Sequence, residues 1–513
     1  MQRFASVFDN KILASNDIFF VIVQQTQLVK TILCRWQFIK YSFIHSLYFN
    51  SNYISLFKNY GQNMLGYERE PHISVGILTE KKIRFELHGD FSSYGFKHFF
   101  SGRFEAEIIN NNIICKGDKD KLEITDEIIF EPQEPDNESF LIRDVTIGVK
   151  FHWERKEKQR FTHSLKLIKD GDKIAVINII PIEKYLMSVI SSEMSAKCSL
   201  SMLKATAVVS RSWLLAQIEK SKRIKTEHIN YHTTYQTEDE YIKWYDREDH
   251  KLFDVCADDH CQRYQGVTKM TSEAVKKAVE QTAGIVLLEG DKILDARFSK
   301  SCGGISESFE NVWEPVKHPS LSSIYDYKFV ADDFDDDFSK EENAAKWIKA
   351  SPPAFCNTTD QRILNQILLD YDQETKDFYR WKVEYTQQEL SELIKKKSGI
   401  DFGLIKDLIP VERGFSSRLI KLKIVGTNKT LTIGKELEIR RTLSETHLYS
   451  SAFIIEKEGD VNGVPEKLIL RGAGWGHGVG LCQIGAAVMA EQGYQFDEIV
   501  IHYFKDAVLK KIY

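Results

Sequence analysis

The sequence predicts an α+β protein, and three observations support this fold class. Short apolar runs that alternate or cluster as they do in strands recur between residues 73 and 151. Two runs with helical spacing follow between residues 182 and 220, and helical and strand-like runs alternate from residue 271 to a glycine-rich segment at 472–485. Because 42% of the 513 residues are hydrophobic, we expect a globular protein with more than one core.

We expect five segments that differ in composition and pattern. They are an over-extended or poorly ordered N-terminus at 1–63, a β-rich module at 64–178, a core with two helices and a group of histidines and cysteines at 179–315, an acidic and helical insertion at 316–380, and a C-terminal part with the glycine-rich segment at 381–513.

The first 63 residues resemble neither a secretory signal nor a membrane span. Aromatic and polar residues interleave there without the basic, apolar and small-residue regions of a signal peptide. The apolar run at 18–23 is far shorter than the roughly 20 residues that a bilayer requires. We therefore expect no transmembrane helix, and we expect Met64 to be the natural first residue.

The individual elements follow from the spacing of apolar residues. In the N-terminal half we expect strands over 73–78, 82–87, 104–114, 122–130 and 141–151, a helix over 182–191 that begins after Pro181, and a second helix over 200–220 with Ser199 as its N-cap. Further along we expect an ordered loop over 240–270, a helix over 271–282, two strands within 285–298, a solvated acidic run at 332–337, strands at 381–385 and 418–425 around a helix at 386–398, and a last helix over 486–492.

The charges argue against nucleic acid as a partner. The 69 basic and 74 acidic residues give a formal net charge of -5 and are spread along the chain. Such a distribution offers no broad cationic surface for a phosphate backbone.

Glu193 is the candidate general acid. It follows the first predicted helix, whose end carries a partial negative charge that favours the protonated carboxyl. A protonated carboxyl can donate its proton to a glycosidic oxygen. The alternative is a glutamate that caps a helix or forms an ion pair.

His250, Cys256, His260 and Cys261 form a candidate metal site. Two imidazoles and two thiols within twelve residues are the donors that tetrahedral zinc prefers, although the spacing is not that of a zinc finger. A disulfide between Cys256 and Cys261, or simple buried thiols, are the alternatives. Asp258 and Asp259 could orient the imidazoles.

The remaining cysteines have no pattern of a disulfide framework. We expect most of them to be small buried side chains, namely Cys34, Cys115, Cys198, Cys356 and Cys482. Cys302 is a poor candidate nucleophile because no motif pairs it with a base.

The glycine-rich segment is a candidate binding loop. Its glycines permit close backbone approach, and His477 and Gln483 offer hydrogen bonds to saccharide hydroxyl or N-acetyl groups. A phosphate loop is the alternative, but the lysine and the spacing of a nucleotide site are missing.

Together these motifs resemble the sporulation stage II protein D / LytB (amidase enhancer) family. The resemblance covers roughly residues 73–513 and rests on ISSEM at 190–194, LKATAVVSR at 203–211, SCGG at 301–304, ENVW at 310–313, Trp381 with Arg418, GWGHGVG at 474–480 and QIGA at 483–486, in the order of the family.

This resemblance implies a role on peptidoglycan in the cell envelope. Family members with lytic transglycosylase activity use the glutamate of this motif, here Glu193, as acid and then base, and the C6 hydroxyl of muramic acid attacks its own C1 to leave a 1,6-anhydro product. Arg211 matches the arginine of the motif and shares a helix face with Lys204 by its spacing, so both are expected to contact substrate.

The resemblance also bears on the metal and on rival functions. Some members bind zinc through a similar set of two histidines and two cysteines, which here implies a closed structural zinc site. The first rival is a non-catalytic protein that binds peptidoglycan glycan strands and stimulates a cell-wall amidase. The second is a zinc-stapled carbohydrate-binding scaffold.

Overall fold

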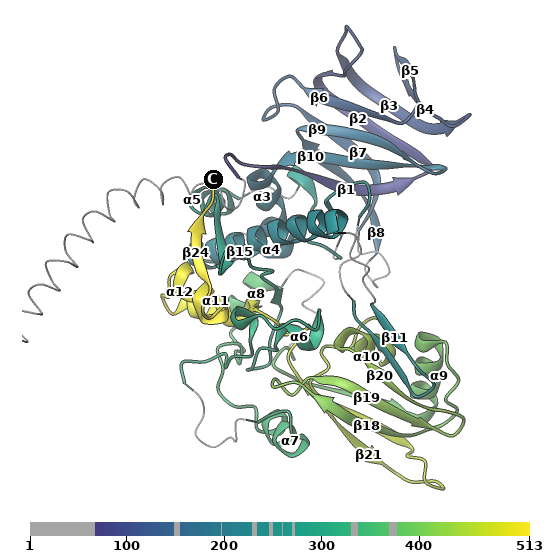
Figure 1. Cartoon of the computed structure of the whole chain (residues 1–513), viewed down its shortest axis with the longest axis vertical. Helices are drawn as coiled ribbons and strands as arrows, with labels where there is room; N and C mark the ends of the chain where they lie inside the picture. Colours follow the sequence, from purple (N-terminus) through teal and green to yellow (C-terminus); the bar gives the residue numbers. More distant parts are fainter. Residues whose placement is uncertain are drawn as a thin grey trace, which may run out of the picture. The chain divides into compact units, whose positions relative to one another are not determined.

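The computed structural model describes residues 67–147, 154–195, 197–227, 233–245, 250–258, 260–268, 272–329, 337–368 and 377–513. Contacts divide the chain into Met1–Glu68 and Arg69–Tyr513, and the architecture below belongs to the second unit. This unit combines helices with strands in several separate sheets, which confirms the α+β class (Figure 1). The expectations for residues 1–63, Met64, Cys34, Asp259 and most of the acidic run lie outside the described residues.

An eleven-stranded sheet occupies the N-terminal part of the described chain. Its strands are β1 (His72–Glu80), β2 (Lys82–Ser92), β3 (Phe100–Ile109), β4 (Asn112–Gly117), β5 (Lys121–Ile124), β6 (Glu127–Pro132), β7 (Ser139–Ile147), β8 (Arg155–Thr162), β9 (Ser164–Asp170), β10 (Lys173–Pro181) and β13 (Val255–Cys256). Alternate residues of β1 and β2 are buried as their pattern predicts. Phe85 and Phe104 are paired across β2 and β3, and their rings stack with centroids 5.2 Å apart.

Two of the expected strands are each divided into two shorter strands. The run at 104–114 divides at Asn110 and Asn111, which both have a positive φ, so that β3 turns back into β4. The run at 122–130 divides into β5 and β6. Asparagine tolerates the left-handed conformation better than most residues, and the apolar pattern on both sides of each turn concealed the break.

Three helices follow this sheet: α3 (Ile182–Glu193), α4 (Leu200–Glu227) and α5 (Glu273–Gln281). α3 packs against α4 and α5 (Figure 1). The two long helices confirm their predictions, and the Ser199 hydroxyl accepts the Met202 N–H at 3.3 Å as expected of an N-cap. The expected position of Glu193 changes slightly, because α3 extends to Glu193 instead of ending before it.

The C-terminal half contains smaller sheets. A five-stranded sheet combines β11 (Thr234–Gln236), β12 (Glu240–Lys243), β18 (Ile405–Arg413), β19 (Leu419–Gly426) and β20 (Thr430–Gly434); the others are β14 (Ile285–Glu289) with β15 (Lys292–Ile293) and β24 (Val508–Lys511), β16 (Phe298–Ser299) with β23 (Leu481–Cys482), and β17 (Arg380–Thr386) with β22 (Lys467–Ala473) and β21 (Phe453–Glu458).

Short helices cover or connect these sheets. They are α6 (Phe309–Val312), α7 (Glu341–Ala350), α8 (Gln361–Ile367), α9 (Gln387–Ser398), α10 (Glu436–Thr442), α11 (Gln483–Glu491) and α12 (Phe496–Tyr503). α9 confirms its prediction and begins with a capping box of Thr386 and Glu389. α11 begins at Gln483, three residues before the expected start. The expected loop over 240–270 contains the short strands β12 and β13.

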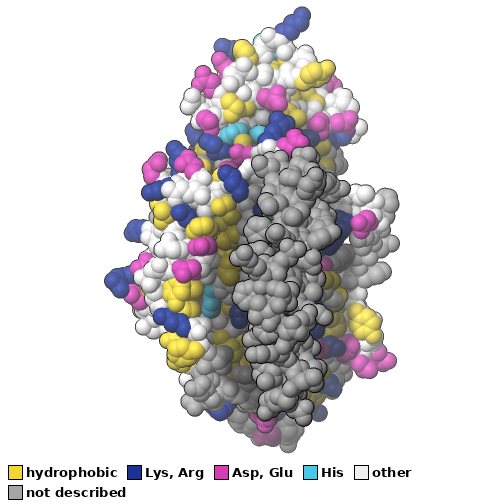
Figure 2. All heavy atoms as spheres, turned by 60° about the vertical axis from the view of Figure 1, so that its left-hand side comes forward, with side chains coloured by type: hydrophobic (Ala, Val, Ile, Leu, Met, Phe, Trp, Pro, Cys, Tyr) yellow, Lys and Arg dark blue, Asp and Glu magenta, His cyan; other side chains and the backbone are white. Residues whose placement is uncertain are grey.

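The surface carries charges of both signs. On the face shown in Figure 2, basic and acidic side chains of the described residues are interspersed. No helix within the described ranges is both long and apolar enough to cross a bilayer.

Candidate functional site

Glu193 is the last residue of α3, at the negative end of the helix dipole. The helix stops because Met194 is extended, while the Met194 N–H still bonds to the Ile190 carbonyl. Ser192 and Met194 are buried, with 3% and 1% of their surface exposed, whereas Glu193 is only partly buried. Glu193 is therefore a partly exposed residue at the C-terminal end of its helix.

The segment after the predicted metal ligands is bonded to α3 along the helix. The Arg263 N–H donates to Oε1 of Glu193 at 3.0 Å. One to two turns earlier, the buried Ser188 hydroxyl accepts the Gln265 N–H at 3.2 Å and donates to the Gly266 carbonyl at 2.8 Å. These three bonds make the orientation of the Glu193 carboxyl depend on the position of this segment.

The structure brings His250, Cys256, His260 and Cys261 together. One nitrogen or sulfur from each lies within 4.8 Å of all the others, and we name this group the cysteine–histidine cluster. Both cysteines are free thiols. The Cys256 N–H donates to the sulfur of Cys261 at 3.4 Å.

The spacing of these atoms fits a tetrahedral metal ion. Nε2 of His250 lies 3.4 Å from the Cys261 sulfur, and Nδ1 of His260 lies 3.5 Å from the Cys261 sulfur and 3.8 Å from the Cys256 sulfur. Zinc bond lengths and tetrahedral angles give an edge of about 3.6 Å between a sulfur and a nitrogen. The Cys261 sulfur, followed by the imidazoles of His250 and His260, lowers the pKa of the Cys256 thiol far below its usual range despite burial. The cluster can therefore hold a metal ion.

The cluster is anchored to the N-terminal sheet. Cys256 belongs to β13, which pairs in parallel with β1 next to Gly76. The Asp254 carboxylate accepts both the N–H and the hydroxyl of Ser74, at 2.8 and 2.7 Å. Gly76 has no side chain where a Cβ would lie 2.5 Å from the Phe253 ring, so Phe253 can cover the strand. The sheet, the cluster and Glu193 are thus linked through one continuous segment.

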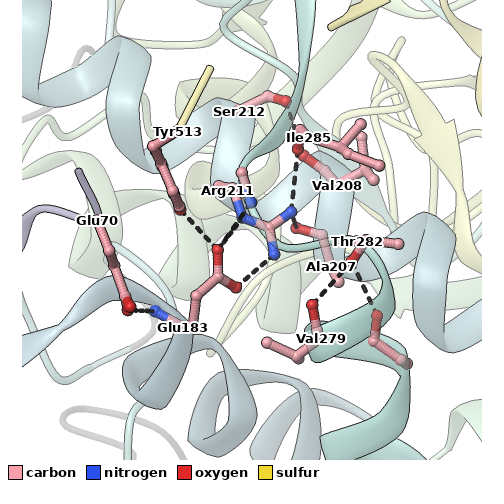
Figure 3. A network of polar contacts seen from close by, with 12 residues as sticks. Glu70, Glu183, Ala207, Val208, Arg211, Ser212, Val279, Thr282, Ile285 and Tyr513 are labelled. Carbon is pink, nitrogen blue, oxygen red and sulfur yellow. Dashed lines mark hydrogen bonds and ion pairs between the residues drawn. The ribbon is translucent and has the colours of Figure 1, made fainter. Parts of the chain in front are cut away.

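The Arg211 side chain bonds to other residues of the protein, and these bonds do not support its expected contact with a sugar. It is fully buried, and its guanidinium bonds to both carboxylate oxygens of Glu183, at 2.9 and 2.6 Å. Figure 3 shows the same carboxylate approached by the Tyr513 hydroxyl at 2.6 Å, while Arg211 also donates to the Ile285 carbonyl at 3.0 Å. Arg211 therefore joins α3, α4, β14 and the C-terminus.

His477 also makes internal bonds. Its Nε2 donates to the Phe298 carbonyl at 2.9 Å, and its Nδ1 accepts the Val479 N–H at 3.0 Å. Burial, with a smaller effect from the positive charge of Arg297, lowers the pKa of His477 to about 3. The neutral ring has no nitrogen left for a saccharide, and its edge packs against Trp313 with centroids 5.1 Å apart. The ENVW and GWGHGVG motifs therefore meet at His477.

The other two expected substrate contacts lie on α11 and α4. Gln483 is the first residue of α11 and is buried, with 3% of its surface exposed. Lys204 is partly buried, and its Nζ lies 5.6 Å from the centre of the Phe496 ring. Nothing in these placements directs either side chain toward Glu193.

Sequence patterns missed the partners that position the candidate site. Arg263 contributes a backbone N–H, which any residue except proline supplies, so its side chain carries no signal. Glu183 is the second residue of α3 and lies 28 positions before Arg211, so no local pattern links the two side chains. Ser188 lies between the apolar residues Met187 and Val189 in α3. This apolar context was the sequence feature that could have predicted a buried, hydrogen-bonded hydroxyl.

Comparison with protein families agrees with the motifs. A family model described as Stage II sporulation protein (SpoIID) matches residues 170–288, from the end of β9 through α3, α4 and the cysteine–histidine cluster to β14. Residues 170–288 are thus identified as a SpoIID domain. A second model, described as a domain of unknown function (DUF8618), matches residues 307–480.

The relatives of the chain are distant in sequence. An uncharacterized protein of Brachyspira hyodysenteriae is 25% identical over 439 residues, which are 83% of this chain and 90% of that protein. Stage II sporulation protein D of Bacillus subtilis is 24% identical over 64% of this chain and 73% of its own length. The amidase enhancer of Bacillus subtilis is 24% identical over 45% of this chain and 32% of its own length.

Proposed function

We propose that this protein acts on the bacterial cell wall and cleaves peptidoglycan glycan strands as a lytic transglycosylase, with Glu193 as the acid and base. The observation that carries the proposal is the placement of Glu193. Its carboxyl is partly exposed at the end of α3 and is oriented by the Arg263 N–H. A single carboxyl that changes its role suffices for this reaction, whereas sugar hydrolases usually need two.

The proposed reaction has two proton transfers. Glu193 first donates its proton to the glycosidic oxygen, so that the bond from that oxygen to C1 of muramic acid breaks. The carboxylate then accepts the proton of the C6 hydroxyl as its oxygen bonds to C1, and the 1,6-anhydro ring closes. The Arg263 N–H bond to Oε1 stabilises the carboxylate between the two steps.

We further propose that the metal of the cysteine–histidine cluster is zinc and that its role is structural. Four protein ligands fill a tetrahedral shell, so no position remains for a reactive water. Cys261 precedes Arg263 by two residues, and a fixed cluster therefore fixes the N–H that contacts Glu193.

Two rival functions share this site. The amidase enhancer among the relatives suggests that the chain stimulates a cell-wall amidase without cutting glycan, and a zinc-stapled scaffold would only bind carbohydrate. The internal bonds of Arg211 and His477 do not distinguish these functions, because binding glycan would use the two expected sugar contacts as much as cleaving it would.

The test is digestion of purified sacculi and of denuded glycan in ¹⁸O-labelled water, followed by mass analysis. We expect 1,6-anhydro-muramic ends without label. Glu193→Gln should lower cleavage by roughly 100-fold or more, the usual scale for loss of general acid catalysis, and should still fold. Glu280→Gln, at an exposed position of α5, is the matched control. Labelled reducing ends would contradict the transglycosylase. If neither form cuts glycan and both stimulate an amidase, the enhancer function is correct.

A further inference from the structure

A second group of metal-binding side chains lies apart from the cysteine–histidine cluster. Cys302, Asp326, Cys356 and Cys482 each offer one sulfur or oxygen, and these atoms all lie within 4.8 Å of one another. All four residues are buried, with 0–2% of their surface exposed. We name this group the three-thiol cluster. Its members come from four segments of the chain, so no local sequence pattern predicted the cluster.

The distances fit a single tetrahedral ion. The sulfurs of Cys302 and Cys356 are 3.7 Å apart, and both residues are free thiols. Two thiolates that bind one zinc ion at the usual bond length are separated by about 3.8 Å. Three sulfurs and one carboxylate oxygen complete a four-donor set in which soft thiolates predominate, and such sets favour zinc over magnesium or calcium.

Hydrogen bonds hold the side chains in place around the common centre. The Cys302 N–H donates to the Cys482 sulfur at 3.2 Å, as the Cys256 N–H does to Cys261 in the other cluster. Asp326 accepts the Cys356 N–H at 2.9 Å and the Tyr503 hydroxyl at 2.6 Å. Such outer contacts orient the ligands of metal sites.

The charge balance calls for a cation. Within the described residues, Asp326 accepts hydrogen bonds from the Cys356 N–H and the Tyr503 hydroxyl but forms no ion pair with a lysine, arginine or histidine. A buried carboxylate is stable when it is paired or bound to a metal. Zinc would leave three thiolates and one carboxylate with the same net charge as a four-cysteine structural site.

Two arginines contact the backbone next to the cluster. Their positive charges would offset part of the net negative charge of the zinc ion with its four ligands. Arg418 is buried and donates to the Cys302 carbonyl at 3.2 Å. Arg380 donates to the Gly303 carbonyl at 3.0 Å. The guanidinium of Arg418 also fills the space where a Cβ on Gly478 would lie 2.4 Å from Cζ, so the arginine reaches the cluster because the glycine-rich segment has no side chain there.

We propose that Cys302, Asp326, Cys356 and Cys482 bind one zinc ion in a closed structural site. Cys302 and Cys482 lie just outside the two ends of the segment at 307–480 that the second family model matches, and Asp326 and Cys356 lie within it. The ion would cross-link the two ends of this segment. It would also fix Gln483 at the start of α11. This inference does not depend on the proposed activity of Glu193.

The first test is the zinc content of full-length protein purified without chelator from zinc-supplemented cells. We expect about two zinc ions per chain, one for each four-ligand site. Cys256→Ser/Cys261→Ser should retain about one, and Cys302→Ser/Cys482→Ser should also retain about one, because each variant destroys one site. Cys115→Ser, which alters a buried thiol of β4 away from both clusters, is the matched control and should keep the content of the unmodified protein.

The decisive variant is Cys256→Ser/Cys261→Ser. If it holds no zinc, the three-thiol site is refuted. If this variant fails to fold, the zinc content of the unmodified chain is the test. Two zinc ions per chain support the three-thiol site, and one or none overturns it.

Cobalt substitution gives an independent readout that identifies the ligands. Thiolate-to-cobalt charge-transfer absorption grows with the number of thiolates, so the three-thiol site should absorb roughly 1.5-fold more than the two-thiol site. Equal absorption would contradict the assignment. A disulfide between Cys302 and Cys356 in the isolated protein, or iron with acid-labile sulfide at this cluster, would also overturn it.

Discussion

The backbone N–H of Arg263 lies 3.0 Å from Oε1 of Glu193, and Arg263 is the second residue after the cluster residue Cys261. The candidate general acid is therefore oriented by a segment whose other end belongs to a candidate metal site. Ser188 adds two more bonds between the same segment and α3. Disturbing this segment should affect chemistry and stability together.

Ser188→Ala should lower both stability and glycan cleavage. The variant leaves the Gln265 N–H without its acceptor in a buried site, at a cost of about 1–3 kcal/mol in the free energy of unfolding. Urea denaturation and the cleavage assay measure the two effects. Ser191→Ala is the control on the same helix, because that hydroxyl bonds only to the Met187 carbonyl within α3 among the described contacts. Equal behaviour of the two variants would show that the contact does not position Glu193.

Cys256→Ser should remove the zinc of the cysteine–histidine cluster and destabilise the protein. Metal binding is coupled to folding in such sites, so the midpoint of thermal unfolding should fall, and chelator should lower it by less than it does in the unmodified chain. Cleavage should also fall because the Arg263 N–H loses its anchor. Cys198→Ser, at a buried thiol that donates to the Gln366 carbonyl, tests for the effect of losing a thiol alone. A zinc content unchanged by Cys256→Ser would disprove the ligand assignment.

Arg211→Met should strongly destabilise the fold. It leaves the Glu183 carboxylate buried without its cation, and breaking a buried pair in this way costs about 3–5 kcal/mol. Lys395→Met, which breaks the exposed pair with Asp401, should change the free energy of unfolding by at most about 1 kcal/mol. Denaturation in urea compares the two. If Arg211→Met instead keeps full stability and loses glycan binding, the sugar contact expected from the motif is correct.

Acid should destabilise the protein in part through His477. Its pKa is about 3 in the folded state and about 6.5 when unfolded. The unfolded chain therefore binds more protons between these values, so the stabilisation is complete above about pH 6.5 and is lost as the pH falls toward 3. Burial acts in the same direction on three further histidines, with pKa values of about 4: His163, His447 and His502.

The measurement is the free energy of unfolding at pH 7 and pH 4. His477→Gln keeps a donor and an acceptor but cannot be protonated, so it should lose less stability than the unmodified chain over this interval, by up to about 3 kcal/mol. His98→Gln, at an exposed histidine that contacts Asp120, is the control for replacing a histidine by glutamine. An identical pH dependence of all three proteins would contradict the buried neutral state of His477.

Local patterns predicted much of the fold and part of the site. The spacing of Tyr185, Leu186 and Val189 predicted α3, and the absence of glycine and proline after Ser199 predicted α4. The cysteine–histidine cluster was visible as a group because its four members lie within twelve residues. Periodicity failed at the β3–β4 turn, where Asn110 and Asn111 reverse the chain inside one apolar run.

The sequence by itself determined the fold class, the family motifs, the identity of Glu193 as the candidate acid and the donors of the cysteine–histidine cluster, since each depends on residues that are near one another in the chain. Tertiary structure alone decided what Arg211 and His477 contact, because the spacing on one element says nothing about the partner that packs against it. The same reason hid the three-thiol cluster, whose Cys302 and Cys482 are 180 residues apart. They meet because β16 pairs with β23. Pairing between strands that are distant in the chain cannot be predicted from a local sequence pattern.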